Sequence, residues 1–376
     1  MNISKFRLIV LIVSTSISAI SQQVHVSQRV PVTKPAMELS AERAMPANAL
    51  TAQVGSKPQN TWTLLATLPG TVIHDMTFTS ATTGYAAAEL GQVWKTTDGG
   101  KTWKEALAAG ETYYFYGVTA SGNDVIVSGF YDSSSVYGVI VVSRDAGQTW
   151  SSPTQITTGW AQRVRYANLH DGLILDLIGD SSGNFAQYTT TGGGSASDWT
   201  TVIDNPDGGW FGLQFSLLTN LHARASGINF CSSQDGGQQW TCGPSVDSIF
   251  DGPVLFLNDT YGWVGGGEIS PNVEGWVHVT TDGGQTWSGR TLDGPWPIRE
   301  FLFINSKRGW ATGGNLYTNV GGMYYTSDGG QTWTVDATTG AEMDACAGHT
   351  IPGGGQIWCA GYNGSLTGVI YSTVVK

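Results

Sequence analysis

Charged residues are scarce in this 376-residue chain, where Asp, Glu, Lys and Arg together make up 12% of the sequence, about half of ordinary usage. The formal net charge is -11, and no run of Lys or Arg occurs anywhere. We therefore expect neither nucleic-acid binding nor a polybasic membrane contact, because both need clustered positive charge. The 13 prolines are too few for a collagen-like chain, which also needs glycine at every third position.

Glycine and aromatic residues are abundant instead, with 51 Gly, 15 Trp and 11% aromatic residues in total. A disordered chain would combine few aromatics with much charge. Long helices need Ala, Glu, Lys and Leu, whereas Gly, Thr, Ser and Trp favour short strands and tight turns. The composition therefore predicts a folded, all-β protein.

The N-terminus has the pattern of a secretory signal peptide over residues 1–21. Lys5 and Arg7 precede a mostly apolar stretch, residues 8–20, that is too short to span a bilayer. Ala19 and Ser21 are small residues at a spacing suited to cleavage. We expect an extracytoplasmic protein, extracellular or periplasmic, with no transmembrane segment after signal removal; a membrane anchor is the alternative.

Residues 22–58 differ from the rest of the chain, because they contain four prolines, no tryptophan and little periodicity. They are expected to form a poorly ordered leader or linker, and a processed propeptide is the alternative. The folded domain is expected to cover residues 59–376.

Four cysteines fall as two local pairs in the second half of the chain. In an exported protein an even number suggests disulfides, and four cysteines allow three connectivities. Pairing Cys231 with Cys242 and Cys346 with Cys359 is the simplest, because each bond would join neighbouring strands of one hairpin. No Cys-x-x-Cys occurs and the histidines are scattered singly, so we expect no metal site and no other cofactor.

An eight-residue sequence recurs along the chain. It first reads Thr-Thr-Asp-Gly-Gly-Lys-Thr-Trp at residues 96–103, and further copies end at Trp150, Trp240, Trp287 and Trp333, with a degenerate copy ending at Trp199. The Trp-to-Trp spacing is 41–49 residues, which is typical of a β-propeller. Each period predicts four short strands, with the octet as the hairpin between the third and the fourth. In the first period we expect strands at 76–79, 84–88, 92–97 and 102–106.

The two ends of the repeat region complement each other. Trp62 lies 41 residues before Trp103, where a fourth strand without its own first three is expected. Residues 368–373 align with residues 91–96, but the chain ends before another Trp. The N-terminal strand should therefore complete the last blade, giving a seven-bladed ring without a free sheet edge.

The octet matches the Asp-box, or bacterial-neuraminidase repeat, Ser/Thr-x-Asp-x-Gly-x-Thr-Trp. The wider frame over residues 84–100, repeated around Trp263 and Trp310, resembles the propellers of photosystem II assembly and stability factors. This resemblance covers residues 60–376 and implies the fold, but Asp-boxes also occur in sialidases, xyloglucan-cleaving glycosidases and sortilin-like receptors. It further implies that the box residues are structural: Asp98, Trp103, Asp145, Trp150, Asp235, Trp240, Asp282, Trp287, Asp328 and Trp333.

A ligand site is expected on the face opposite the Asp-box turns, where the loops after the second and fourth strands meet over the central channel. Flat rings stack on sugars and nearby polar groups bind hydroxyls; the alternative is that many of these rings pack between blades. The aromatic residues of these loops are Tyr113, Tyr114, Tyr116, Tyr131, Trp160, Trp210, Phe211, Phe250, Trp276, Trp296, Tyr317 and Tyr362, to which the unassigned Trp358 is added. Candidate ligand contacts among them are Trp160, Trp210, Trp276 and Trp296.

Arg163, Arg165 and Arg299 complete this candidate site together with Glu300. The arginines occupy equivalent points leading into inner strands of the repeat, and arginine suits bidentate recognition of carboxylates. A sialidase would also use three arginines, but its early Arg-Ile/Val-Pro motif appears only at residues 29–31, in the leader. That departure counts against a sialidase.

The predicted function is a secreted, monomeric, non-catalytic propeller that binds a glycan or a protein. The alternatives are a carbohydrate-active hydrolase, xyloglucanase-like or sialidase-like, and an assembly factor for a membrane complex, a family whose basic patch fits poorly with a net charge of -11. A hydrolase needs two carboxylates across a sugar, whereas we expect none to converge among the loop-face candidates Asp132, Asp207, Asp251, Glu268, Glu274, Asp293, Glu300 and Asp344. No catalytic residue is assigned.

Overall fold

The computed structural model describes residues 60–157, 160–166, 172–177, 184–189, 191, 193–205, 210–215, 222–227, 229–245, 252–268, 274–292, 296–315, 318, 320–351 and 354–376. The chain divides into two units, Met1–Ala49 and Leu50–Lys376, and every described residue belongs to the second. The expected signal peptide and leader lie outside the described residues.

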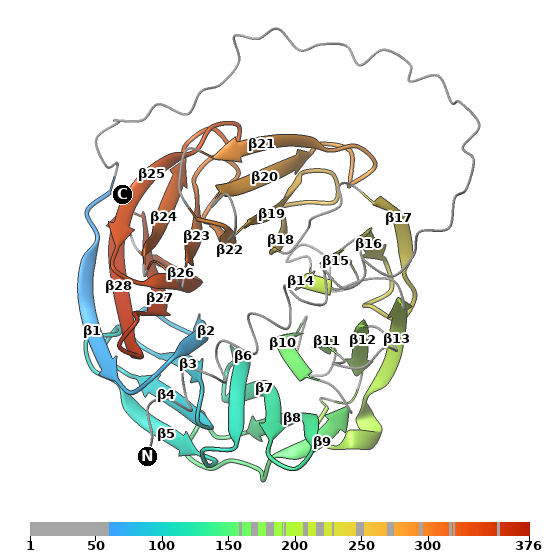
Figure 1. Cartoon of the computed structure of the whole chain (residues 1–376), viewed down its shortest axis with the longest axis vertical. Helices are drawn as coiled ribbons and strands as arrows, with labels where there is room; N and C mark the ends of the chain where they lie inside the picture. Colours follow the sequence, from blue (N-terminus) through green and yellow to red (C-terminus); the bar gives the residue numbers. More distant parts are fainter. Residues whose placement is uncertain are drawn as a thin grey trace, which may run out of the picture. The chain divides into compact units, whose positions relative to one another are not determined.

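The second unit is an all-β propeller (Figure 1), in which the described strands form seven four-stranded antiparallel sheets. The first three sheets follow the chain from the inside outwards. They contain β2 (Ile73–Phe78), β3 (Gly84–Ala88), β4 (Gln92–Thr96) and β5 (Lys104–Ala108); β6 (Tyr113–Ser121), β7 (Asp124–Asp132), β8 (Val136–Ser143) and β9 (Thr154–Thr157); and β10 (Trp160–Tyr166), β11 (Gly172–Leu177), β12 (Asn184–Thr189) and β13 (Thr200–Asn205).

Three further sheets repeat this order. They contain β14 (Trp210–Phe215), β15 (Ala223–Gly227), β16 (Asn229–Ser233) and β17 (Thr241–Ser245); β18 (Val254–Phe256), β19 (Gly262–Glu268), β20 (Glu274–Thr280) and β21 (Ser288–Leu292); and β22 (Ile298–Phe303), β23 (Gly309–Asn315), β24 (Val320–Thr326) and β25 (Thr334–Thr339). The remaining sheet has the order β26 (Glu342–Ile351), β27 (Gly354–Tyr362), β28 (Thr367–Val375) and β1 (Thr63–Pro69).

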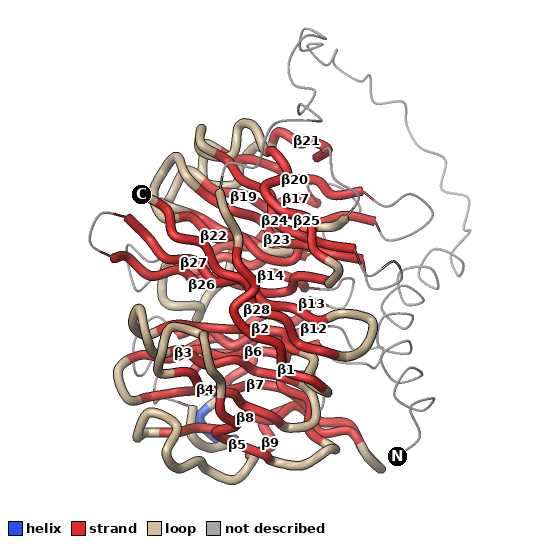
Figure 2. The backbone as a smooth tube through the Cα atoms, turned by 90° about the vertical axis from the view of Figure 1, so that its left-hand side faces the viewer, coloured by secondary structure: helices blue, strands red, loops and turns tan. Residues whose placement is uncertain are grey.

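The innermost strands β2, β6, β10, β14, β18, β22 and β26 contact one another in a closed cycle, with β26 returning to β2. Figure 2 shows the same strands from the side; the one helix of the described residues is a short 3-10 turn, η1 (Ala196–Asp198). The N-terminal strand does join the last sheet, as predicted, because β1 pairs with β28.

Two strands of the first period differ from their predicted positions. The inner strand starts at Ile73 instead of 76, because a register shift between Ile73 and Asp75 interrupts the apolar–polar alternation. The outer strand starts at Lys104 instead of 102, because Asp98 still holds the turn at Thr102 through the backbone N–H and the hydroxyl.

The bond from the first residue of the Asp-box to its carboxylate recurs in every full copy. In the first box the Thr96 hydroxyl donates to Asp98 over 2.9 Å and accepts from the Gly100 N–H over 2.9 Å. The indole N–H of Trp103 donates to the Gly100 carbonyl over 3.0 Å. Equivalent bonds to the box carboxylate form at Asp145, Asp235, Asp282 and Asp328. The degenerate copy keeps the indole bond, from Trp199 to the Gly193 carbonyl, and the bond from the Thr191 N–H to the Thr189 hydroxyl.

Acid should weaken the fold through these turns. Hydrogen bonds from the Thr side chain and backbone lower the pKa of Asp98, Asp145 and Asp282 to about 2. A lowered pKa stabilises the folded state above the unfolded value of 3.8, and this contribution is lost as the pH falls towards 2. We expect urea unfolding midpoints to drop steeply between pH 4 and pH 2, and Asp145→Asn to lower the midpoint at pH 7 while flattening that drop.

The exposed Glu105→Gln on β5 is the control, since its side chain accepts no hydrogen bond among the described residues. An Asp145→Asn variant with the acid dependence of the unmodified chain would contradict the role assigned to the turn carboxylates.

Asp336 fastens the N-terminal segment to the neighbouring sheet at β25. Its carboxylate is 1% exposed and accepts hydrogen bonds from the backbone N–H of Asn60 (3.0 Å), the Asn60 amide (2.9 Å), the Trp62 indole (2.8 Å) and the Trp310 indole (3.2 Å). Trp62 thus anchors the closing strand through its polar edge.

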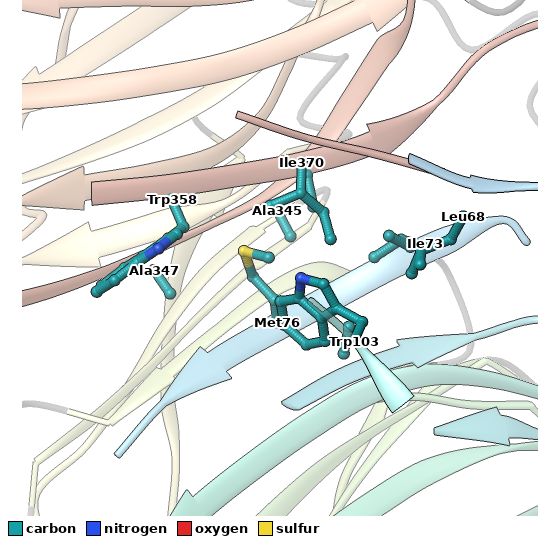
Figure 3. Packing of buried hydrophobic residues seen from close by; sticks show 10 residues of the cluster. Leu68, Ile73, Met76, Trp103, Ala345, Ala347, Trp358 and Ile370 are labelled. Atoms are coloured by element: carbon teal, nitrogen blue, oxygen red, sulfur yellow. The ribbon is translucent and has the colours of Figure 1, made fainter. Parts of the chain in front are cut away.

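A buried cluster joins the first and last sheets where the ring closes (Figure 3). Met76, Trp103, Trp358 and Ile370 are among its members. Trp358 is 0% exposed, stacks on Phe78 with ring centroids 3.7 Å apart, and donates its indole N–H to the Gly99 carbonyl over 2.8 Å. The prediction that Trp358 belongs to the ligand face is therefore wrong; it packs between two sheets.

Both predicted cysteine pairs form disulfides, Cys231–Cys242 between β16 and β17 and Cys346–Cys359 between β26 and β27. In each pair the two residues are direct cross-strand partners with Cα atoms 4.1 Å apart. Disulfides of this kind form and persist in oxidising compartments.

Candidate functional site

Six of the seven inner strands contain a register shift close to their first residues. A β-bulge leaves one residue unpaired and re-aims its side chain. All inner strands run in the same direction, so their starts lie at one end of the ring, opposite the Asp-box turns; we call it the loop end. The residues at the shifts are His74, Tyr116, Gln162, Phe211, Arg299 and Asp344.

His74 lies between two carboxylates at the loop end. Its Nδ1 is 3.2 Å from Asp344 Oδ2 on β26, and its Nε2 is 3.2 Å from Glu89 Oε1 after β3. The three side chains are only 11%, 13% and 5% exposed, respectively. The Tyr116 ring stacks on the imidazole at 3.9 Å, and Tyr362 meets it edge-on at 5.8 Å.

The His74 pKa is raised to about 9, so the ring is cationic at neutral pH. Burial alone would lower the pKa, but the hydrogen bonds and charges of Asp344 and Glu89 outweigh it. A raised pKa stabilises the fold below the unfolded value of 6.5, and the contribution is lost as the pH rises through 9.

We expect the free energy of unfolding to fall by about 3 kcal/mol between pH 6.5 and 9.5, because the folded protein loses the His74 proton in this range. His74→Gln should be less stable at pH 6 and should lose most of this slope. Urea titrations at half-unit pH steps measure both quantities, and equal slopes for the two proteins would contradict the assignment.

Glu342 is the most enclosed carboxylate of the group, with a side chain 3% exposed. Burial, and then the charge of Asp344, raise its pKa to about 7. Arg299 opposes this through ion-pair contacts of 3.0 and 3.1 Å, and the Tyr362 hydroxyl donates to Glu342 over 3.3 Å.

Arg163 and Arg165 of β10 reach across the centre of the ring. Arg163 pairs with Glu300 of β22, and Arg165 contacts the same carboxylate at 3.6 Å. Arg165 also donates to Asp75 of β2 over 2.9 Å. Two sheets separate β10 from β22 in one direction around the ring and three in the other, and Figure 1 shows the two strands on opposite sides of the central opening. The centre is therefore crossed by charged side chains at this level.

The arginines therefore do not form an unpaired basic patch. Asp75 is 4% exposed, and its carboxylate accepts hydrogen bonds from the Arg165 guanidinium and from the backbone N–H of Val118. Arg163, Arg165 and Arg299 are 19%, 24% and 30% exposed, and each is paired with a carboxylate. Their positive charge is largely neutralised within the ring.

Arg163, Arg165, Arg299 and Glu300 were predicted from sequence and are brought together here. Trp296 is different: it is 1% exposed and packs beside Tyr324 at 5.3 Å, so its expected exposure on the ligand face is wrong. A ring this hydrophobic gains more from the gap between two sheets than from solvent. Trp276 is half-buried on β20, and the Trp160 and Trp210 side chains lie outside the described part of the chain.

Two carboxylates that were not among the predicted loop-face candidates lie near one that was, Asp344, so the expectation that no two candidates converge stays a prediction. Asp344 lies across His74 from Glu89 and beside Glu342. His74, Asp75, Glu89 and Glu342 were absent from the candidate site. The repeat could have found the bulge positions, because His74 follows Trp62 by 12 residues and Arg299 follows Trp287 by 12.

Three tyrosines form a separate aromatic group at the loop end of the second sheet. Tyr113 and Tyr131 have ring centroids 5.1 Å apart, and Tyr131 stacks on Tyr137 at 4.8 Å. All three side chains are half-buried, so each keeps part of its surface in contact with solvent.

Within the described residues, no group of three or more His, Cys, Asp or Glu side chains is placed to hold a metal ion. No helix in the described part of the chain is long and apolar enough to cross a membrane.

Comparison with known proteins supports the repeat. Residues 324–335 match the BNR/Asp-box repeat. These residues contain the last box, with Asp328 and Trp333. No curated protein matches the chain.

Solved structures of low sequence identity share the fold of this chain. YCF48 bound to a D1 peptide has a TM-score of 0.60 at 18% identity, over 89% of this chain and 100% of that one. YCF48 from Cyanidioschyzon merolae has a TM-score of 0.60 at 19% identity, over 83% and 98%. A chain of the mitotic checkpoint complex has a TM-score of 0.60 at 12% identity, over 90% and 98%. At these identities the likeness concerns the fold alone.

Proposed function

We propose that this chain is a non-catalytic binding protein, a seven-bladed propeller whose partner docks at the loop end. The observation that carries the proposal is the pair of arginines, Arg163 and Arg165, that cross the ring to Glu300 and Asp75. Because these side chains occupy the centre, a ligand is held at the loop end and does not thread through the ring.

The preferred partner is a segment of another protein. Charged groups at the loop end come from four sheets, as a peptide backbone with varied side chains would require. The YCF48 structure with a D1 peptide supports the choice through the shared fold alone. A glycan is the other ligand on this face, and the rings of Tyr113, Tyr131 and Tyr137 would stack on it.

Export and the domain boundaries belong to the same proposal. The signal peptide over 1–21, the leader over 22–58 and the propeller over 59–376 predict a protein outside the cytoplasm. The two disulfides support an oxidising location. A mass spectrum of the native protein would test all three boundaries at once, since cleavage at either predicted site shortens the chain by a defined mass.

Peptide and glycan arrays probed with the purified chain test the binding function. We expect a peptide hit that isothermal titration confirms and that Asp344→Asn weakens, with Glu105→Gln on the outer strand β5 as the control. A glycan hit weakened by Tyr131→Ala would select the other ligand. Absence of binding on both arrays would contradict the proposal.

Glycoside hydrolysis is the second candidate, favoured by Glu342 and Asp344. A carboxyl whose pKa lies near 7 beside a second carboxylate has the character of an acid–base pair. Glu342 is 3% exposed and bound to Arg299, however, which shields it from a sugar. Release of reducing sugar from polysaccharides by the unmodified chain, but not by Glu342→Gln, would promote this function over binding.

An assembly role for a membrane complex rests on the resemblance to assembly factors. Co-purification of the chain with a membrane complex from its source, and loss of that complex in a deletion strain, would support it. A deletion strain with normal levels of all such complexes would contradict it.

A further inference from the structure

The ionisable groups at the centre of the ring do not balance in charge. Five carboxylates among the described residues face four cationic side chains, which leaves one negative charge in excess. Burying an uncompensated charge is costly, so such a charge attracts a proton or a cation. The groups are Asp75, Glu89, Glu300, Glu342 and Asp344 against His74, Arg163, Arg165 and Arg299.

The excess lies on the His74 side. Arg163 and Arg165 are matched by Glu300 and Asp75. The other three carboxylates, Glu89, Glu342 and Asp344, are shared by only two cations, His74 and Arg299.

An unsatisfied atom marks the same place. Glu89 Oε1 contacts His74. The other oxygen, Oε2, is buried on a side chain that is only 5% exposed, and no described residue donates a hydrogen bond to it. A buried carboxylate oxygen without a donor costs free energy. Asp344, which contacts the other ring nitrogen of His74, is 13% exposed and is the member of the group most open to the solvent.

We infer that the group of Glu89, Glu342 and Asp344 binds a primary ammonium, carried by a lysine side chain or by the N-terminus of the docked segment. This inference rests on the proposed function, since the ammonium belongs to the partner. An ammonium is a compact charge with three N–H donors, which suits carboxylates from separate segments of the chain, here two on β26 and one after β3. A guanidinium needs two coplanar acceptors, whereas Asp344 already gives Oδ2 to His74.

Binding of the ammonium is linked to release of a proton. Burial and the charge of Asp344 raise the Glu342 pKa to about 7, so the unliganded site holds part of a proton at neutral pH. Arriving positive charge favours the ionised form and expels that proton. The tyrosines packed on the group, Tyr116 and Tyr362, stay neutral because burial raises their pKa well above 10.

The test compares short synthetic peptides by isothermal titration with the full chain. One peptide is capped at both ends and contains lysine, its partner has norleucine in place of lysine, and a third has a free N-terminus and no lysine. We expect at least tenfold tighter binding of one amine-bearing peptide than of the norleucine peptide, and affinity that rises between pH 5.5 and 7.5. Tighter binding of the lysine peptide would identify a lysine side chain as the source of the ammonium, and tighter binding of the third peptide would identify a free N-terminus.

Asp344→Asn and Glu89→Gln should each bring the affinity ratio between amine and norleucine peptides close to one. Asp132→Asn, at the loop end of β7, is the control and should leave the ratio unchanged. Near-UV circular dichroism establishes that each variant is folded before titration. A heat of binding that varies with the ionisation enthalpy of the buffer would show the released proton.

The outcomes separate the two proposals. Equal binding of all three peptides overturns the ammonium site and leaves the binding function in place. Tenfold preference that survives Asp344→Asn and Glu89→Gln also overturns the site, because the amine then binds elsewhere. If no peptide binds and neither the peptide array nor the glycan array gives a hit, both the ammonium site and the binding function are contradicted.

Discussion

Replacing Asp336 by alanine is expected to lower the free energy of unfolding by about 4 kcal/mol. The carboxylate is 1% exposed and accepts four hydrogen bonds, two from Asn60 and one each from Trp62 and Trp310. Alanine would leave the Trp310 indole N–H without this acceptor and would detach the segment that leads into the closing strand β1. Urea unfolding followed by tryptophan fluorescence measures the change.

Asp336→Asn is the matched variant, because it keeps the shape but replaces one acceptor oxygen by an NH2 group that faces the donors. We expect its free energy of unfolding to lie between those of the unmodified chain and of Asp336→Ala. Glu105→Ala, on the exposed surface of β5, should change stability by less than about 0.5 kcal/mol. An Asp336→Ala loss no larger than that of Glu105→Ala would contradict the role of this carboxylate in ring closure.

Arg165→Met is expected to cost about 3 kcal/mol, since it removes the cation that faces Asp75 and Glu300 across the centre. Methionine keeps the apolar length of the side chain, so most of the loss reflects the two carboxylates left behind. Asp75 is 4% exposed, which prevents water from replacing the arginine.

Adding Asp75→Asn to Arg165→Met should restore part of the stability, because it removes one uncompensated charge; the double-mutant cycle should give a coupling of about 1–3 kcal/mol. Arg144→Met is the matched control: its ion pair with Asp124 is 3.1 Å long but the arginine is 47% exposed. Surface pairs contribute at most about 1 kcal/mol. Equal losses for Arg165→Met and Arg144→Met would show that the cross-centre pairs are no stronger than a surface pair.

The repeat made most of the fold predictable from local sequence. Each octet carries its own turn chemistry, since Asp98 and its equivalents bond to residues within four positions of themselves. A turn that is satisfied locally can be read from the sequence without knowing what surrounds it. The pairing of each cysteine with its neighbour along the chain was predictable for the same reason.

The site was only partly predictable. Arg163, Arg165 and Arg299 stood out because arginine is rare in this chain, but their partners did not. Glu300 was found as a neighbour of Arg299 in sequence, whereas Asp75 and Glu342 lie 90 and 43 residues from the arginines they pair with. Trp296 and Trp358 were misplaced, because the sequence shows a large ring and does not show whether it faces solvent or a neighbouring sheet.

The sequence by itself determined an all-β repeat with Asp-box turns, a closing N-terminal strand and two hairpin disulfides, because all of these depend on short-range patterns or on the count of repeats. Only the tertiary structure decided the charge pattern at the loop end. Bulges at the starts of separate strands place His74, Arg299 and Asp344 at the loop end, where His74 pairs with Asp344 and Arg299 with Glu342. Closure of the ring places the first and last of these strands side by side, so residues 270 positions apart share one ion pair.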